Sequence, residues 1–114
     1  MTSCIFCQIS KRELPAKIVF EDNHCLAFED VHPQAPLHLL VIPKRHIESL
    51  NELGSEDEGL LGHLTFIAKE LALRHPVGAT GYRTVINTGA NAGQSVFHVH
   101  LHLLAGRPMQ WPPG

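Results

Sequence analysis

Three histidines alternate with aliphatic residues near the C-terminal end of the sequence, in the segment HVHLHLL at residues 98–104. A β-strand sends alternate side chains to opposite faces, so His98, His100 and His102 are expected to share one face while the aliphatic residues enter the core. Neighbours on one face are separated by about 6.6 Å, so their rings can converge on one small polyatomic group. A half-buried strand with histidine at its polar positions is the plain alternative. Three histidines in succession favour a functional site.

Two kinds of chemistry suit such a cluster. Neutral imidazoles can share a metal ion, or one imidazole can attack phosphorus while the others stabilise charge. A catalytic metal usually needs a nearby carboxylate, but residues 79–114 contain no Asp or Glu. The glycine-rich segment at residues 89–93 leads instead into Gly93-Gln94-Ser95, a loop of the kind that binds anions through backbone N–H groups. The surroundings therefore favour phosphate over metal at His100 and His102.

The rest of the sequence predicts the elements that hold these histidines in place. Apolar runs separated by turn residues predict five strands, and apolar residues at helical spacing between positions 60 and 71 predict one helix. Ser55 and Glu58 have the spacing of a capping box that would start this helix. The expected strands cover residues 17–20, 25–28, 37–42, 82–87 and 95–104, and the expected helix covers residues 56–74. We predict an α+β domain: an antiparallel sheet of about five strands with one main helix.

Length and composition limit the number of domains, the class of protein and the kinds of partner. The 114 residues suit a single domain covering residues 1–114, and 44% apolar with 18% charged residues is typical of a globular protein. A formal net charge of -2 gives no basic surface for nucleic acid, and no segment has the length or character of a signal peptide or membrane span. Three cysteines, an odd number, argue against a disulfide framework and for a reducing compartment. We therefore expect a cytoplasmic protein without nucleic-acid or membrane partners.

The residues around the three histidines resemble the histidine triad (HIT) superfamily, and more narrowly its nucleotide-binding phosphoramidase branch. The resemblance is carried by HVHLHLL with Gly93-Gln94-Ser95 before it, and runs nearly end to end through these segments: IVFED (18–22), AFED (27–30), PQAP (33–36) with His38, VIPK (41–44), GYR (81–83) and WPPG (111–114). It implies the HIT-like fold with its sheet continued across a homodimer, and the tail near the partner's active site. The implied activity is hydrolysis of the P–N bond of purine nucleoside 5′-phosphoramidates, with no cofactor required for chemistry.

The same resemblance assigns roles to individual residues. It implies that His100 is the nucleophile, held in one tautomer by the backbone carbonyl of His98, that His102 contacts phosphate and that His38 supports the cluster. Residues expected to bind the nucleotide are Asp30 at the ribose, Ser95 and Asn87 beside the phosphate and leaving group, Gly93 and Gln94 in the loop, and Phe6, Ile9, Phe28, Val31 and Leu40 around the base. Each has a structural alternative: Phe28 and Leu40 also suit a core, Asp30 a turn and Asn87 a strand end.

Cys4 and Cys7 form a CxxC pair near the start of the sequence, which by itself is half of a zinc site. No βαβ pattern follows, so a thioredoxin-like role is disfavoured. Some histidine triad relatives complete a structural zinc site here with two histidines, and the matching residues are His46 and His98. The alternative is two buried thiols without a metal.

Two other functions remain open. The chain could be a nucleotide-binding regulatory module with incidental hydrolysis, or a dinucleoside polyphosphate hydrolase of a neighbouring branch. The intact triad argues against a pure binder, which needs no neutral nucleophile at His100. Ser95 and the WPPG ending argue against the dinucleoside polyphosphate branch.

Overall fold

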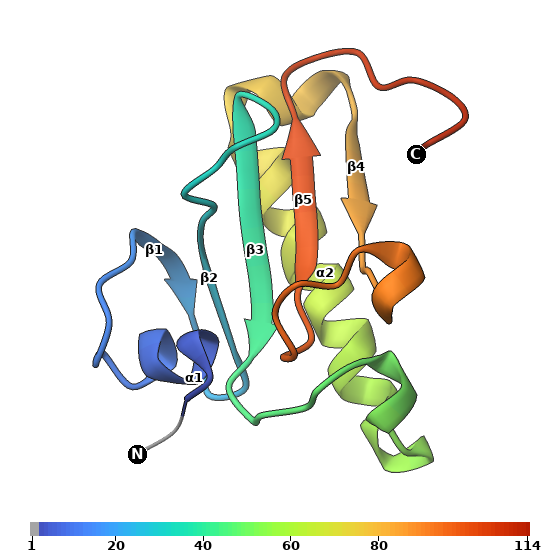
Figure 1. Ribbon diagram of the computed structural model, residues 1–114. Coiled ribbons are helices and arrows are strands. Elements are labelled where there is room, and N and C mark those ends of the chain that lie inside the picture. Colours follow the sequence, from blue (N-terminus) through green and yellow to red (C-terminus); the bar gives the residue numbers. More distant parts are fainter. Residues whose placement is uncertain (1–2) are drawn as a thin grey trace.

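Five antiparallel strands form one sheet in the computed structural model, which describes residues 3–114. The order across the sheet is β1-β2-β3-β5-β4, so β3 and β5 lie side by side although a long helix and β4 separate them in the chain (Figure 1). The strands are β1 Ile18–Glu21, β2 Cys25–Glu29, β3 Leu37–Pro43, β4 Tyr82–Val85 and β5 Leu101–Ala105. The expected α+β arrangement of five strands and one main helix is confirmed.

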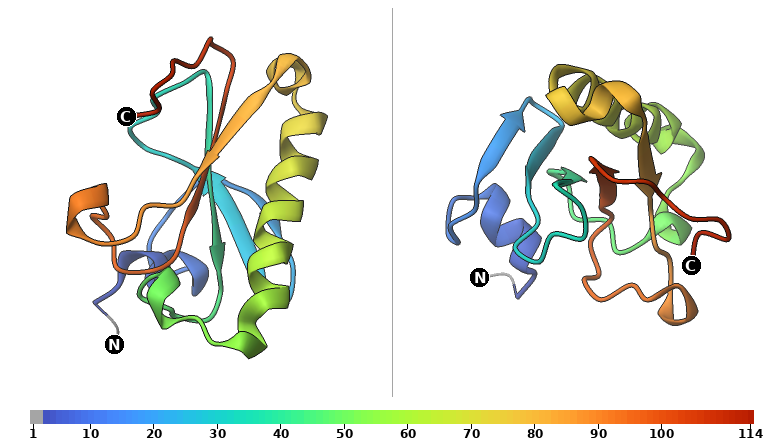
Figure 2. Two further views of the ribbon diagram at one scale, coloured as in Figure 1. Left: turned by 90° about the vertical axis from the view of Figure 1, so that its right-hand side faces the viewer. Right: turned by 90° about the horizontal axis from the view of Figure 1, so that it is seen from above.

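The main helix, α2 (Glu58–Arg74), covers one face of this sheet (Figure 2). Leu64 and Ile67 form its buried stripe together with Ala68 and Ala72, as the apolar spacing predicts. The predicted capping box is wrong. A 3₁₀ turn at Ser55–Asp57 precedes the helix, and the Gly54 N–H donates to Asp57 Oδ2 at 2.9 Å, so an acid one residue before the expected Glu58 closes the turn.

A short helix, α1 (Ile5–Ser10), packs against the opposite face (Figure 2). Successive residues of β2 and β3 point to opposite faces and divide the core between the two helices. Cys25, Ala27 and Val41 pack with α2, whereas Leu26, Phe28, Leu40 and Ile42 pack with Phe6 and Ile9 of α1. The face that carries α1 is therefore shaped by side chains of β2, β3 and α1.

Strand β5 begins later than the sequence predicts. The ladder between β3 and β5 runs from Leu37 opposite Ala105 to Val41 opposite Leu101, so His98 and His100 precede the strand and only His102 lies within it. The expectation that all three imidazoles stand on one strand is wrong. The Val99 N–H donates to the Ile47 carbonyl at 2.7 Å, so this segment bonds to a loop instead of the ladder.

Two features complete the surroundings of the histidines. The glycine-rich segment contains a 3₁₀ turn at Ala90–Ala92, flanked by Gly89 and Gly93 with positive φ angles of 84° and 82°. Such angles favour glycine, so the turn depends on both residues. Trp111 in the tail is 82% exposed.

None of the helices in residues 3–114 combines the length and apolar character that crossing a membrane requires.

Candidate active site

A cavity of about 400 Å³ lies on the α1 face of the sheet and gathers most of the residues predicted to bind the nucleotide. Its lining includes Phe6, Ile9, Phe28, Asp30, Val31, Leu40, Asn87, Gly93, Ser95, His100 and His102. Other lining residues were not predicted from the sequence, among them Ile5, Leu14, Pro15, Ala16 and Val96. No lysine or arginine is among the described residues of this lining, so phosphate here would be held by imidazoles, hydroxyls and N–H groups. We call this space the triad cavity.

A backbone hydrogen bond decides which ring nitrogen of His100 is available to react. The residue is 6% exposed, and Nδ1 lies 2.7 Å from the carbonyl oxygen of His98. A carbonyl only accepts, so Nδ1 carries the proton and donates, and Nε2 keeps its lone pair. His100 lines the triad cavity. The local backbone therefore selects the tautomer of His100 in which Nε2 has the lone pair needed for nucleophilic attack.

A chain of hydrogen bonds fixes the tautomer of His102 in turn. The Gln34 N–H donates to His38 Nδ1 at 3.0 Å, so neutral His38 carries its proton on Nε2. That Nε2 lies 2.8 Å from His102 Nδ1, which must accept. Neutral His102 therefore carries a proton on Nε2 and can donate a hydrogen bond to an anion. The role that the resemblance implies for His38, support of the cluster, has a geometric basis here.

Burial favours the neutral forms of His38 and His102. It is the largest cause lowering the pKa of His102 to about 4, with smaller contributions from His100 and His38 and an opposing one from Asp30. Burial also lowers the pKa of His38, again against Asp30. A neutral chain from His38 to His102 agrees with the hydrogen-bond directions above.

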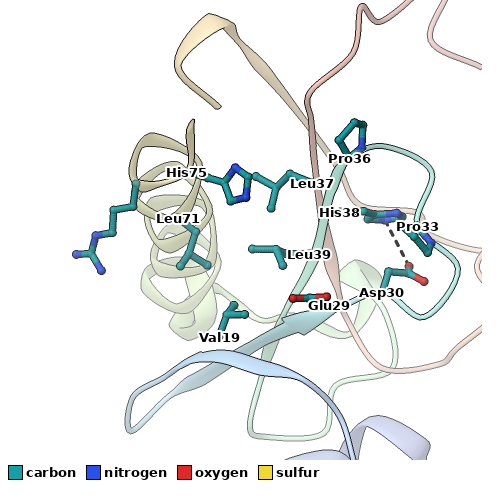
Figure 3. A pocket seen from close by; sticks show the side chains of 11 residues that line it. Val19, Glu29, Asp30, Pro33, Pro36, Leu37, His38, Leu39, Leu71 and His75 are labelled. Atoms are coloured by element: carbon teal, nitrogen blue, oxygen red, sulfur yellow. Dashed lines mark ion pairs between the residues drawn. The ribbon is translucent and has the colours of Figure 1, made fainter. Parts of the chain in front are cut away.

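Asp30 forms the turn that the sequence offered as its structural alternative, and it also lines the triad cavity. Its Oδ1 accepts from the His32 N–H at 2.8 Å, which is the turn-forming bond, and its Oδ2 lies 3.4 Å from His38 Nε2. Asp30 lines the triad cavity and also a smaller hollow of about 290 Å³ beside α2, where its pairing with His38 is visible (Figure 3). The turn therefore holds this carboxylate between His38 and the cavity.

The loop before the triad is held by Gln94, a residue that is 7% exposed. Its Oε1 accepts from the Gly89 N–H at 2.9 Å, and its Nε2 donates to the carbonyls of Glu48 at 2.7 Å and Val96 at 3.1 Å. Gln94 is the one predicted nucleotide contact that does not line the triad cavity. Its side chain shapes the loop that places Ser95 there.

The apolar side chains around the cavity are both core and lining. Phe6, Ile9, Phe28 and Leu40 are 3–6% exposed and share one cluster with Leu26 and Ile42. The sequence left core and base-binding slot as alternatives for Phe28 and Leu40, and the structure places both residues in the core and in the wall of the triad cavity. Val31, at 84% exposure, stands at the rim.

The CxxC pair meets two histidines, as expected for a metal centre. Cys4 Sγ lies 3.4 Å and Cys7 Sγ 3.6 Å from His98 Nδ1, while His46 Nδ1 lies 3.3 Å from both Cys7 Sγ and His98 Nδ1. His98 Nε2 donates to the Pro43 carbonyl at 2.8 Å, which leaves the Nδ1 lone pair directed at the sulfurs. We call these four residues the metal cluster.

The metal cluster fits tetrahedral zinc. Sulfur and nitrogen ligands at ordinary zinc distances lie about 3.4–3.8 Å from one another around a tetrahedron, close to the separations above. All four donor atoms lie within 4.8 Å of one another. Two sulfurs and two imidazoles are a common structural zinc set, and they leave no open position for catalysis.

Comparisons with known proteins agree with this geometry. The family described as "Scavenger mRNA decapping enzyme C-term binding" matches residues 3–111. Uncharacterized HIT-like proteins of Synechocystis sp. and Synechococcus elongatus are each 56% identical over 110 residues, covering 96% of both chains. Among solved structures, a HIT family hydrolase from Legionella pneumophila has 50% identity and a TM-score of 0.95, covering 98% of this chain and 100% of its own. One from Clostridium thermocellum has 41% identity and a TM-score of 0.92, covering 96% of each chain. With its histidine cluster, fold and near full-length relatives in agreement, the chain belongs to the histidine triad (HIT) superfamily.

Proposed function

We propose that this protein is a nucleotide-binding hydrolase that cleaves the P–N bond of purine nucleoside 5′-phosphoramidates through a nucleotidyl-histidine at His100. The observation that carries the proposal is the 2.7 Å bond from His100 Nδ1 to the His98 carbonyl, which in a neutral ring leaves the Nε2 lone pair for attack in a residue that lines the triad cavity. A protein that only bound nucleotide would have no need of a neutral, directed imidazole.

The reaction has two displacements at phosphorus. His100 Nε2 forms a bond to phosphorus, the P–N bond to the amine breaks, and the amine leaves with that electron pair and takes up a proton from water. A water molecule then attacks phosphorus, loses a proton and releases Nε2, which yields the nucleoside monophosphate. The Nε2–H of His102 donates to a phosphate oxygen as negative charge builds up in each step.

The remaining cavity residues suit a nucleoside monophosphate. The Asp30 carboxylate suits the paired ribose hydroxyls, and the apolar walls from α1 and β2 suit the flat face of a purine. Ser95 and Asn87 line the same cavity and supply a hydroxyl and an amide beside the phosphate and leaving group.

Turnover of adenosine 5′-phosphoramidate by the wild type and by His100→Ala tests the proposal. Removal of the nucleophile is expected to lower kcat/KM by at least about 10³-fold. His75→Ala is the matched control, because this exposed histidine follows α2 and is absent from the triad cavity. Retained turnover in His100→Ala would refute the covalent route. No turnover by the wild type, with AMP still bound, would favour the regulatory binding module.

A second candidate reaction is cleavage of a phosphoanhydride in a dinucleotide, favoured by the decapping-enzyme description of the matched family. The same His100 attack would then release a nucleotide in place of an amine. Parallel assays with adenosine 5′-phosphoramidate and a diadenosine polyphosphate decide between the two substrates, and we expect the higher kcat/KM for the phosphoramidate.

We also propose that the protein is a homodimer with one continuous sheet. Strand β4 is an edge of the sheet, and an unpaired edge is a site for strand pairing. Tyr82 on this strand is 38% exposed, and Trp111 in the tail is 82% exposed. Sedimentation equilibrium is expected to give twice the chain mass of 12.6 kDa.

The metal cluster is proposed to hold one structural zinc ion. Bound there, zinc would supply no reaction step, and would tie the start of α1 to the loop of His46 and to His98. Protein purified without chelator or nickel resin is expected to contain about one zinc per chain, and a content far below one would contradict the site.

A further inference from the structure

Helix α1 takes part in the triad cavity and in the metal cluster within a few residues. Phe6 and Ile9 line the cavity, whereas Cys7 in the helix and Cys4 just before it belong to the cluster. The helix has six residues, and isolated helices shorter than about 12–15 residues are marginal in water. The position of α1 therefore depends on what these side chains contact.

Phe6 contacts residues of both sites at once. Its ring centroid lies 5.1 Å from that of His100 and 5.9 Å from that of His98, with interplanar angles of 82° and 74°. It also meets Phe28 edge-on at 5.4 Å. A shift of α1 would therefore move a cavity wall and alter the packing of the proposed nucleophile together.

The metal cluster is the other attachment of α1. Without a metal, the thiols of Cys4 and Cys7 meet imidazole nitrogens at 3.3–3.6 Å, and thiols form only weak hydrogen bonds. Coordination of one Zn²⁺ by the same atoms would replace these contacts with much stronger bonds. Metal binding therefore changes how firmly α1 is tied to the residues that precede β5.

We propose that Zn²⁺ binding at the metal cluster and nucleotide binding in the triad cavity are thermodynamically coupled through Phe6, so that the metal raises nucleotide affinity. The inference rests on the proposed nucleotide site. Coupling between two sites is reciprocal, so AMP must tighten Zn²⁺ by the same factor by which Zn²⁺ tightens AMP. We expect about tenfold, within the usual range of such effects.

Titration calorimetry on the full chain tests this coupling. The Kd of AMP is measured for zinc-loaded and chelator-treated protein, and the Kd of Zn²⁺ with and without saturating AMP. Two equal factors near ten are expected. A factor of one in both titrations would overturn the proposal. Global unfolding of the chelated protein, seen as loss of far-UV circular dichroism, would also overturn it, because zinc would then be needed for folding as a whole.

Three variants locate the coupling. Cys7→Ser removes a ligand, so its AMP affinity is expected to match that of chelated wild type whether or not Zn²⁺ is present. Cys25→Ala is the matched control on the α2 face and keeps the full effect of Zn²⁺. Phe6→Ala keeps every ligand but is expected to bring the coupling close to one. Full coupling in Phe6→Ala would overturn the route through this ring.

Failure of the proposed function is distinguishable from failure of this inference. Loss of phosphoramidate turnover with AMP binding retained would bear only on the reaction. If the wild type bound no AMP, the proposed nucleotide site would fail and the coupling with it. If AMP binds, amide hydrogen exchange in residues 5–10 tests whether zinc removal loosens α1. Faster exchange there after zinc removal is expected, and unchanged exchange would overturn the inference.

Discussion

His98 and His100 lie two residues apart, and each ring donates one hydrogen bond to a backbone carbonyl, yet they use opposite ring nitrogens for it. His98 donates from Nε2 to Pro43, so its Nδ1 lone pair faces the thiols of the metal cluster. His100 donates from Nδ1 to His98, so Nε2 is left for the triad cavity. The ring nitrogen that donates to the backbone decides which nitrogen keeps its lone pair. The surroundings, thiols for His98 and the triad cavity for His100, then decide what that lone pair can meet.

Paired substitutions give the largest test of this difference. His100→Gln is expected to lower kcat/KM at least about 10³-fold, because the amide cannot attack, with little change in thermal stability. His98→Gln is expected to lose zinc and about 1–3 kcal/mol of stability while keeping most of kcat. Both variants are assayed for turnover and zinc content and by urea unfolding. An equally large loss of kcat in folded His98→Gln would show that the His98 ring acts in catalysis.

The second test removes the support of His102 instead of a ring that reacts. His38→Ala takes away the Nε2–H that His102 Nδ1 accepts at 2.8 Å, so His102 can adopt either tautomer. We expect kcat for adenosine 5′-phosphoramidate to fall about 10- to 100-fold, of the order seen when a positioned proton donor is lost, with KM changed little. If kcat/KM fell only because KM rose, with kcat constant, His38 would contribute to substrate binding alone.

The positions of these rings were predictable only in part. Period-two alternation placed Val99, Leu101 and Leu103 in the core, and all three are at most 2% exposed. The same alternation extended the strand too far, because it does not show that the Val99 N–H bonds to Ile47 in a distant loop. Periodicity therefore predicted which side chains are buried, but not where the ladder ends.

The cavity was predictable through the resemblance and not through any pattern in the residues. The spacing of Phe6, Phe28 and Leu40 gives no hint that they meet, since they come from α1, β2 and β3. Leu14 and Pro15 line the cavity without being predicted, because they carry no chemical signal and lie between α1 and β1. Local sequence rules do not predict which apolar residues from distant elements meet in the folded chain.

The pH dependence of stability sharpens the contrast between buried and exposed imidazoles. The pKa of His102 falls from 6.5 to about 4 in the folded chain, chiefly through burial, so between these values the unfolded state binds more protons. The free energy of unfolding is therefore expected to decrease as the pH is lowered from about 6.5 to about 4. His102→Gln should reduce this slope in urea unfolding with chelator present throughout. An unchanged slope would show that His102 is not a source of it.

The smallest effect is expected on the opposite face of the sheet, where a histidine pairs with a carboxylate of the first hairpin and does not line the triad cavity. His63 of α2 lies 2.6 Å from Asp22 Oδ2, while Asp22 Oδ1 accepts from the N–H groups of His24 and Cys25 at 2.8 Å. Burial raises the pKa of Asp22, but the hydrogen bonds from His63, His24 and Cys25 outweigh it and hold this pKa well below its ordinary value. The carboxylate thus joins the hairpin of β1 and β2 to α2.

Asp22→Asn keeps an oxygen for the turn and removes the charge, so we expect a loss of about 0.5–1 kcal/mol in urea unfolding at pH 6, as for a partly exposed ion pair. Asp22→Ala also leaves two N–H groups without their acceptor and should cost about 1 kcal/mol more. Phosphoramidate turnover should be unchanged in both variants, because Asp22 and His63 do not line the triad cavity. Reduced kcat in folded Asp22→Asn would mean that the two faces of the sheet are coupled, and that burial alone does not separate structural histidines from reactive ones.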